Sequence, residues 1–238
     1  MTGACVMLRK MINFAPPFWH WLHIVKRMIT GDNIRAALFD LDGVVFDTEG
    51  QYSVFWGSQC RLYRPDCPGL EDKIKGQTLV QIFDKYFAGM EDVQSKIVAS
   101  LDEFERNMSF DYVAGFLDFV SRLRGKGVKT AVVTSSNKVK MEAVYAARKE
   151  FKGLFDAILT AEDFERSKPD PDCYLKGAAM FGLEPSECVV FEDSFNGLKS
   201  GRAAGMTVIG LATTNDAVAI EPYCDEVIKD FRELVGVI

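Results

Sequence analysis

The chain has 238 residues, a formal net charge of −6 and 48% apolar residues. This is enough to bury a core, in one domain with an insertion or in two small domains. The acidic balance argues against a nucleic-acid-binding protein, which would present a basic face. Small anionic substrates stay compatible, because local cations or a metal can bind them.

The first 31 residues differ from the rest, because they carry four basic side chains and no acidic one. Their aromatic stretch FAPPFWHWLHIV (14–25) is interrupted by two prolines and two histidines and is too short to cross a bilayer. It also lacks the cleavage site of a signal peptide. We expect residues 1–31 to be a start-site artefact with Met28 as the true first residue, a surface-packed extension, or an interfacial membrane segment.

The cysteines and histidines exclude several kinds of site. The six cysteines form no CxxC pair and no zinc-ligand spacing, which is typical of reduced thiols in a cytoplasmic protein. Both histidines, His20 and His23, lie within the first 31 residues. If the remaining chain is an enzyme, it works without imidazole, which excludes Ser-His-Asp and Cys-His mechanisms.

Five apolar runs predict strands, and helical patterns separate several of them. The strand candidates are Ala36–Asp40, Val128–Thr134, Phe155–Thr160, Cys188–Asp193 and Met206–Gly210. The helix candidates are Phe116–Gly127, Asp170–Gly182 and Phe195–Gly205. Continuous apolar runs indicate a parallel sheet covered on both faces. The alternation predicts an α/β fold with a doubly wound, Rossmann-like parallel sheet.

Residues 47–111 contain no strand of that kind. They show three helical patterns instead: SVFWGSQCRLY, TLVQIFDKYF and VQSKIVASLDEFERNM. We therefore expect a helical cap at 47–111, inserted into a catalytic core made of 32–46 and 112–238. Such a cap, hinged near Asp47 and Tyr112-Val113, could shield a reactive intermediate from water and open to exchange products.

Polar side chains follow the predicted strands where each one ends. They are Asp40 and Asp42 after the first run, Thr134, Ser135 and Ser136 after the second, Lys168 in SKPDPD, and Glu192 and Asp193 after the fourth. Each group alone also fits a turn, a helix cap or a solvated charge. Ligands of open α/β sheets bind at the carboxyl ends of the strands. The repeated occurrence of polar side chains at this one edge therefore predicts a binding site.

The residue types at this edge indicate phosphoryl transfer. Asp40 and Asp42 are two residues apart and can face one ligand, and Asp193 would add a third carboxylate. Three carboxylates without histidine or thiolate suit a hard cation, most plausibly Mg²⁺. Lys168, the Thr134 hydroxyl and the backbone N–H groups after it can hold phosphoryl oxygens, and a carboxylate is available as nucleophile.

Four segments in order, DLDGVVFDTEG, VVTSS, SKPDPD and FEDSFNGLKSGRAAGM, resemble the four motifs of the haloacid dehalogenase superfamily. The resemblance covers about residues 34–238 and points to its phosphatases and β-phosphoglucomutase-like members with a helical cap. It implies that Asp40 attacks phosphorus and forms an aspartyl-phosphate. It implies that Asp42 acts as general acid and then as base. The second aspartate is absent from the dehalogenases, so its presence argues for phosphate esters.

The resemblance also implies the binding groups of this site. Thr134 and Ser135 would bind phosphate, and Lys168 would neutralise both the phosphate and the nucleophile. Mg²⁺ would be held by Asp40, the backbone carbonyl of Asp42 and Asp193, with support from Glu192.

Two departures from the mutase pattern concern the cap. The mutases carry a His four residues after the first-motif Thr, where this chain has Tyr52, and an Arg in a cap loop, where KIKGQTLVQ offers Leu79. We therefore place hydrolysis of a small phosphomonoester, first of all a sugar phosphate, ahead of a β-phosphoglucomutase-type reaction. A non-catalytic binding protein on the same fold is the third alternative.

Substrate specificity is expected from two loops. The candidates are Gly76 and Gln77 in the cap, and Ser136 and Asn137 after the second strand. For Ser136 and Asn137, a structural role as helix N-cap and solvated first turn fits as well as a role in substrate binding. We expect a small phosphorylated substrate, no nucleic-acid or membrane partner, and a monomer, with a homodimer as the alternative.

Overall fold

The computed structural model describes residues 33–75 and 77–235. Within them six parallel strands form one sheet in the order β3-β2-β1-β4-β5-β6. The strands are β1 (Ala36–Phe39), β2 (Lys129–Val133), β3 (Ala157–Leu159), β4 (Cys188–Glu192), β5 (Thr207–Leu211) and β6 (Glu226–Ile228). The predicted α/β fold with a parallel sheet is confirmed. The edge strand β6 is absent from the prediction because three residues, one of them acidic, give no apolar run.

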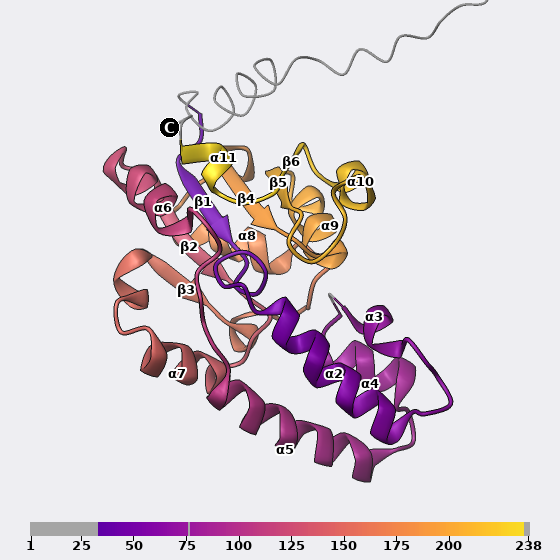
Figure 1. Ribbon diagram of the computed structural model, residues 1–238. Coiled ribbons are helices and arrows are strands. Elements are labelled where there is room, and N and C mark those ends of the chain that lie inside the picture. Colours follow the sequence, from indigo (N-terminus) through magenta and orange to yellow (C-terminus); the bar gives the residue numbers. More distant parts are fainter. Residues whose placement is uncertain (1–32, 76, 236–238) are drawn as a thin grey trace, which may run out of the picture.

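Helices cover both faces of this sheet, as Figure 1 shows. One face packs against α6 (Phe116–Gly125), α7 (Lys138–Ala147) and α11 (Arg232–Val235). The other packs against α8 (Asp172–Met180), α9 (Phe195–Ala203) and α10 (Ala217–Ile220). Side chains of a strand alternate between faces, so β1 sends Ala37 and Phe39 into the first layer and Ala36 and Leu38 into the second.

Aromatic side chains fill the first layer below the carboxyl end of β1. The Phe39 ring stacks on Phe191 of β4 with centroids 4.8 Å apart, and meets Phe116 edge-on at 5.5 Å. Phe119 and Phe231 complete this group. All five rings are fully buried. Close-packed rings have few alternative arrangements, so the backbone that carries Asp40 rests on a rigid base.

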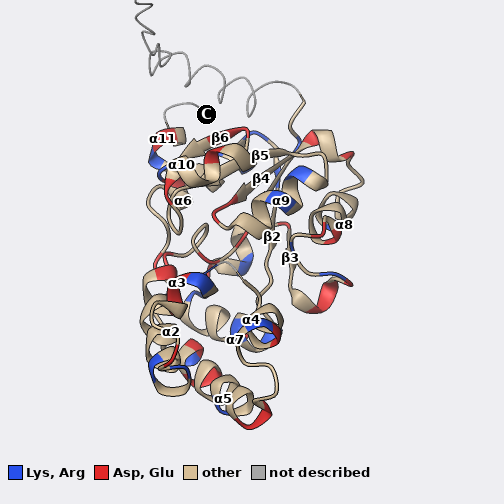
Figure 2. Cartoon of the chain, turned by 90° about the vertical axis from the view of Figure 1, so that its right-hand side faces the viewer, with Lys and Arg blue, Asp and Glu red and all other residues tan. Residues whose placement is uncertain are grey.

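Four helices lie between β1 and α6 and form the cap (Figure 1 and Figure 2). They are α2 (Glu49–Tyr63), α3 (Leu70–Ile74), α4 (Leu79–Tyr86) and α5 (Glu91–Asn107). Three of them match the predicted helical patterns, while the five-residue α3 is too short to give a periodic signal. The cap has an apolar cluster of its own, which includes Phe55, Trp56, Ile82 and Phe87.

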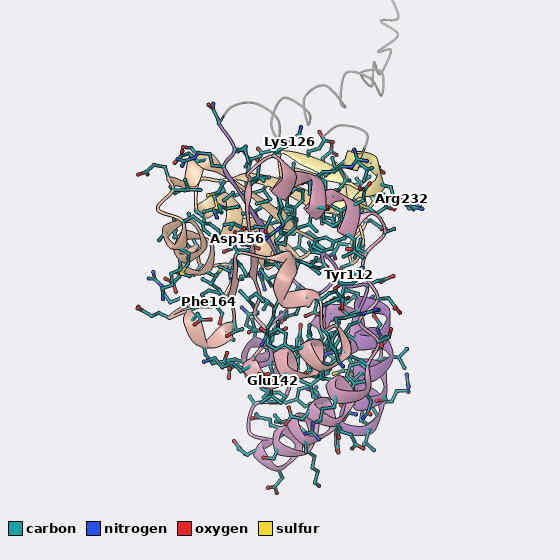
Figure 3. The ribbon with its side chains drawn as sticks, turned by 90° about the vertical axis from the view of Figure 1, so that its left-hand side faces the viewer. Tyr112, Lys126, Glu142, Asp156, Phe164 and Arg232 are labelled. Carbon is teal, nitrogen blue, oxygen red and sulfur yellow. The ribbon has the colours of Figure 1, made fainter. Side chains whose placement is uncertain are left out.

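The two chain segments that join core and cap lie side by side. The Asp47 N–H donates to the Asp111 carbonyl at 2.8 Å, and the Val113 N–H donates to the Val45 carbonyl at 3.0 Å. Figure 3 labels Tyr112 at this junction, with Lys126 and Arg232 at the far end of the core. The two segments that connect the cap to the core are thus hydrogen-bonded to each other and are not independent loops.

Short 3-10 turns complete the core: η1 (Phe151–Leu154), η2 (Ala161–Asp163), η3 (Pro185–Glu187) and η4 (Glu221–Tyr223). No helix in the part of the chain that the structure describes is long and apolar enough to span a membrane. The expectations for residues 1–31 and for Gly76 lie outside the described residues. The strand order changes direction at β1, where ligands of doubly wound sheets bind.

Candidate active site

Asp40 and Asp42 leave the end of β1 in a tight turn. The Asp40 N–H still pairs with the Phe191 carbonyl of β4 at 3.0 Å, so Asp40 continues the strand. Gly43 then adopts φ +71°, and its N–H donates to the Phe46 carbonyl at 2.8 Å. A Cβ at this glycine would lie 2.0 Å from Asp193 Oδ2. Only glycine permits both this conformation and this approach, and the turn brings Asp40 and Asp42 to one cavity.

Lys168 lies at the centre of the core part of the site. Its Nζ is 2.8 Å from Asp40 Oδ1 and 2.6 Å from Glu192 Oε1, and it donates to the Val133 carbonyl at 3.1 Å. The side chain is 5% exposed, so the interpretation of Lys168 as a solvated charge is wrong. Burial opposes its charge, but Asp40 and Glu192 raise the pKa of Lys168 above its usual value. The ammonium is a permanent cation beside Asp40.

Glu192 and Asp193 end β4 in different roles. Glu192 is fully buried and accepts from the Tyr174 hydroxyl at 2.9 Å and from the Asp193 and Ser194 N–H groups at 3.0 and 3.1 Å. The next helix is capped by Ser194, whose hydroxyl accepts from Gly197 N–H at 3.0 Å. Glu192 therefore holds Lys168 and the start of α9 in place, and neither acid is the cap of that helix.

The carboxylates of Asp40, Glu192 and Asp193 offer oxygen atoms that all lie within 4.8 Å of one another. Burial, with Lys168 acting against it, raises the pKa of Asp40 from 3.8 to about 7. Burial and the neighbouring Glu192 raise the pKa of Asp193 well above its usual value. Buried carboxylates this close repel one another. An all-oxygen donor set with excess negative charge fits Mg²⁺.

Asp42 is held by groups from both sides. Its Oδ1 accepts from the Thr48 hydroxyl at 2.7 Å, and its Oδ2 accepts from the Ser136 hydroxyl at 3.2 Å. The Lys140 ammonium forms an ion pair with the same Oδ2. Lys140 is 3% exposed and lies over the ring of the cap residue Tyr52, 4.8 Å from its centroid. The Asp42 carboxylate therefore has a fixed orientation toward the cavity.

The loop after β2 supplies the remaining core groups. Thr134 is buried and its hydroxyl accepts from the Ser136 N–H at 3.0 Å, while Ser135 is exposed. Asn137 caps α7, because its side chain accepts from the Lys140 N–H at 2.9 Å. Asn137, rather than Thr134 or Ser135, is the helix cap here. All four side chains also line the cavity (residues 134–137).

Core and cap enclose a cavity of about 270 Å³. It is lined by all the predicted core groups except Glu192, which is fully buried behind them. Gln77 of the cap lines it too, and its amide donates to the Tyr86 hydroxyl at 3.3 Å. Gln81 of α4 joins cap to core, donating to the Lys168 carbonyl at 3.3 Å and accepting from the Asn196 amide at 3.2 Å. The roles of the predicted residues stay predictions at this point.

Several residues of the site have no clear sequence signal. Thr48 and Glu49 stand at the start of the cap helix α2, and Thr214 follows β5. Lys140 lies in the first turn of α7, which is not among the predicted helices. Thr214 donates a hydrogen bond to Asp193. Lys140 and Thr214 are far from Asp42 and Asp193 in sequence, so only the packing of α7 and the loop after β5 brings them together. The position of Thr214 after a strand end was the one available hint.

The comparisons with known proteins agree with this geometry. The family model of the haloacid dehalogenase-like hydrolases matches residues 34–205. The chain belongs to this family. This hydrolase is 32% identical over 198 residues to Hexitol phosphatase A of Escherichia coli (strain K12), covering 81% of this chain and 88% of that protein. The resemblance inferred from the four motifs is confirmed.

Two further comparisons limit what the similarity to known proteins shows. Over 130 residues the hydrolase is 35% identical to Protein SUPPRESSOR OF QUENCHING 1, chloroplastic, of Arabidopsis thaliana, which covers 55% of this chain but only 12% of that protein. A HAD hydrolase of family IA, variant 3, from Entamoeba histolytica has the same fold, with a TM-score of 0.73 and 22% identity over 86% of this chain and 99% of that one. This likeness concerns the fold alone.

Proposed function

We propose that this HAD-type enzyme is a Mg²⁺-dependent phosphoric monoester hydrolase that acts on a small phosphorylated metabolite, with sugar phosphates as the first candidates. The observation that carries the proposal is the group formed by Asp40, Lys168 and Asp193 beside Asp42, within one cavity covered by the cap. The similarity to Hexitol phosphatase A supports it.

In the first half-reaction an Asp40 oxygen forms a bond to phosphorus while the bond from phosphorus to the leaving oxygen breaks. Asp42 donates its proton to that leaving oxygen, and an alcohol departs. In the second half-reaction Asp42 takes a proton from water, the water oxygen attacks phosphorus, and the bond to Asp40 breaks. Inorganic phosphate is released and Asp40 is free again.

Lys168, Thr134 and Ser135 hold the phosphoryl oxygens in this proposal. Lys168 offers a buried cation 2.8 Å from the nucleophile, and such a charge is worth most where water is excluded. Asp40, the Asp42 carbonyl and Asp193 would hold Mg²⁺, with support from Glu192. When bound, the ion lowers the repulsion between the nucleophile and the phosphate.

The runner-up is a phosphosugar mutase, and the cap disfavours it. A mutase must hold a second phosphate, and two cap residues, a His and an Arg, handle it in the mutase pattern. At the two positions in question, Tyr52 donates its hydroxyl to Glu105 at 2.7 Å and Leu79 is apolar. We therefore keep hydrolysis first, the mutase second and the binding protein third.

Three wider predictions accompany this function. Residues 47–111 act as a lid over the core, hinged where Asp47 and Val113 pair with the opposite connecting segment. The enzyme works in the cytoplasm, in keeping with the free thiols of Cys60, Cys67, Cys173, Cys188 and Cys224. It binds neither nucleic acid nor membranes, and it is a monomer, with a homodimer as the alternative.

The test is phosphate release from a panel of sugar phosphates and other small monoesters, with Mg²⁺ and with EDTA. We expect release by the wild type with Mg²⁺ only, and a loss on the order of 10⁴-fold or more in Asp40→Asn, because the nucleophile is removed. No release from any ester, together with conversion of β-glucose 1-phosphate to glucose 6-phosphate, would replace hydrolysis by the mutase reaction.

A further inference from the structure

The part of the cavity that faces the cap, which we call the leaving-group end, carries excess negative charge. Its ionisable lining residues are Asp42, Glu49, Glu71, Asp102, Glu105, Lys75 and Lys140. Five carboxyl groups thus face two ammonium groups. A phosphate ester placed with its phosphorus at Asp40 would point its carbon skeleton into this end.

Both ammonium groups already have acidic partners. Lys140 pairs with Asp42 and lies over the Tyr52 ring. Lys75 Nζ lies 3.2 Å from Asp72 Oδ1. Neither arginine nor histidine lines the cavity among the residues that the structure describes. A second anionic group on the substrate would therefore have to share a cation with a carboxylate that is already bound to it.

The carboxyl groups at this end outnumber the cations that could compensate their charge. Glu105 is 8% exposed and accepts from the Tyr52 hydroxyl at 2.7 Å. Burial raises the pKa of Glu105, and burial together with Asp42 raises the pKa of Glu49 to about 7. Buried acceptors of this kind are stabilised by hydrogen-bond donors. A further negative charge would disfavour them, whereas substrate hydroxyl or ammonium groups would satisfy them.

Aromatic and apolar surface lies beside these acceptors. Trp56 and Tyr52 of α2, Leu79 and Ile82 of α4, and Leu101 of α5 line the same cavity. Small-ligand sites commonly combine apolar walls with a few oriented polar groups. Acceptors next to aromatic rings match a carbon chain or ring with C–H faces and hydroxyl donors.

We propose that the substrate's leaving group is a hydroxyl-rich carbon skeleton without a second anionic group, and that Glu105 is a specificity residue that rejects phosphorylated acids and bisphosphates. This inference rests on the proposed function, because the position of the leaving group follows from phosphorus at Asp40. It narrows the substrate class from small phosphomonoesters to those of neutral or amino-bearing polyols.

The test compares two esters with the same six-carbon chain. Sorbitol 6-phosphate ends in a hydroxymethyl group and 6-phosphogluconate ends in a carboxylate. Their Kd values are measured by calorimetry with Mg²⁺ and the Asp40→Asn protein, which is not expected to turn them over. We expect sorbitol 6-phosphate to bind at least about 30-fold more tightly than 6-phosphogluconate, since like charges placed together at an interface are costly. Equal affinity, tighter binding of the acid, or no binding of the neutral ester would overturn the inference.

A second pair separates neutral from cationic leaving groups. Glucosamine 6-phosphate and glucose 6-phosphate differ by an ammonium and a hydroxyl group. If the carboxyl groups act mainly through charge, the amino ester binds more tightly. If they act as hydrogen-bond acceptors, the two esters bind alike. An amino ester bound about 30-fold more weakly would contradict both and overturn the inference, because it would show that the end repels cations.

Variants on α5 test whether Glu105 is the residue that discriminates between the two esters. Glu105→Gln keeps an acceptor for Tyr52 and removes the charge, so the affinity ratio between sorbitol 6-phosphate and 6-phosphogluconate should fall to within about tenfold. Glu103→Gln on the exposed side of the same helix is the matched control and should leave the ratio unchanged. If Glu105→Gln does not fold, Glu105→Met, which has a similar volume and no charge, takes its place. An unchanged ratio in the folded variant would overturn the assignment.

Turnover by the wild-type enzyme separates this inference from the proposed function. Discrimination in binding without phosphate release from any ester of the panel would refute hydrolysis and leave the charge selection standing. Release of phosphate with 6-phosphogluconate as the better substrate would support hydrolysis and refute the charge selection.

Discussion

The two ends of the cavity differ in the partners that they give to buried carboxyl groups. At the phosphate end, Asp40 and Glu192 share the Lys168 ammonium at 2.8 and 2.6 Å, and a metal ion would add further positive charge. At the leaving-group end, Glu105 has a tyrosine hydroxyl as partner and Lys140 is already paired with Asp42.

This difference follows from the origin of the residues. The phosphate end is built from strand ends of one sheet, so its cations and anions are positioned by a rigid core. Most of the leaving-group end is built by helices of the cap, whose side chains meet the core residues Asp42 and Lys140 only where the two parts pack together. We infer that the core performs a reaction common to many substrates, whereas the cap selects among them.

The largest effect in this comparison is expected from Lys168→Met, which removes the buried cation of the phosphate end. Asp40 and Glu192 are left without it, so the free energy of unfolding should fall by roughly 3 to 5 kcal/mol. The kcat/KM should fall by about 10³-fold, as for loss of a group that stabilises transition-state charge. Urea unfolding and steady-state kinetics measure both.

Lys96→Met is the matched control for this prediction, because Lys96 is exposed on α5. It should change neither quantity. A Lys168→Met protein as stable and as active as the control would remove the proposed importance of the buried cation.

The next effect is expected from Asp42→Asn, which keeps the shape of the side chain but removes the proton that we propose it transfers. We expect kcat to fall by roughly 100-fold or more, the usual contribution of general acid–base catalysis. The loss should be smaller for esters with an acidic leaving group such as p-nitrophenol, because they need less protonation. Equal losses for p-nitrophenyl phosphate and a sugar phosphate would contradict the role of general acid.

A smaller effect is expected from Lys140→Met, at the boundary between the two ends. Its ammonium orients Asp42 through their ion pair. We expect kcat to fall by about tenfold, at the low end of what a supporting partner contributes. Because the change also removes a cation from the leaving-group end, 6-phosphogluconate should bind more weakly to this variant than to the wild type. Tighter binding of the acid in this variant would argue against our account of the charge.

The smallest effect concerns stability and pH at the leaving-group end. Glu49 has a pKa raised from 4.5 to about 7 by burial and by Asp42. Between these values the folded protein binds more protons than the unfolded chain, so its stability falls as the pH rises from about 4.5 to about 7. Glu49→Gln should therefore be more stable than the wild type at pH 7.5 and similar to it at pH 4.5.

Urea midpoints at pH 4.5 and 7.5 measure this effect, with Glu103→Gln as an exposed control on the cap. If Glu49→Gln and the wild type lose the same stability between the two pH values, Glu49 does not carry the unfavourable charge that its surroundings indicate.

Local patterns in the sequence were sufficient for the fold class and for the strand-end residues. Continuous apolar runs such as AALF and CVVF predict buried parallel strands, and the carboxyl ends of parallel strands meet at one edge. The position of Asp40, Thr134 and Asp193 around one cavity is therefore a consequence of topology. The short elements β6, α3, α10 and α11 escaped prediction because three to five residues do not show a period. The ten-residue helix α7 was not predicted either.

Only the tertiary structure decided which distant groups meet. Nothing near Lys140 in the sequence indicates that it pairs with Asp42, or that Glu105 accepts a hydrogen bond from Tyr52. The first contact depends on how α7 packs beside the loop after β1, and the second on how α2 and α5 pack within the cap. The residues at the strand ends could thus be predicted from local sequence, because backbone pairing positions them. The proposed selection of substrate could not, because it depends on side chains that only packing brings together.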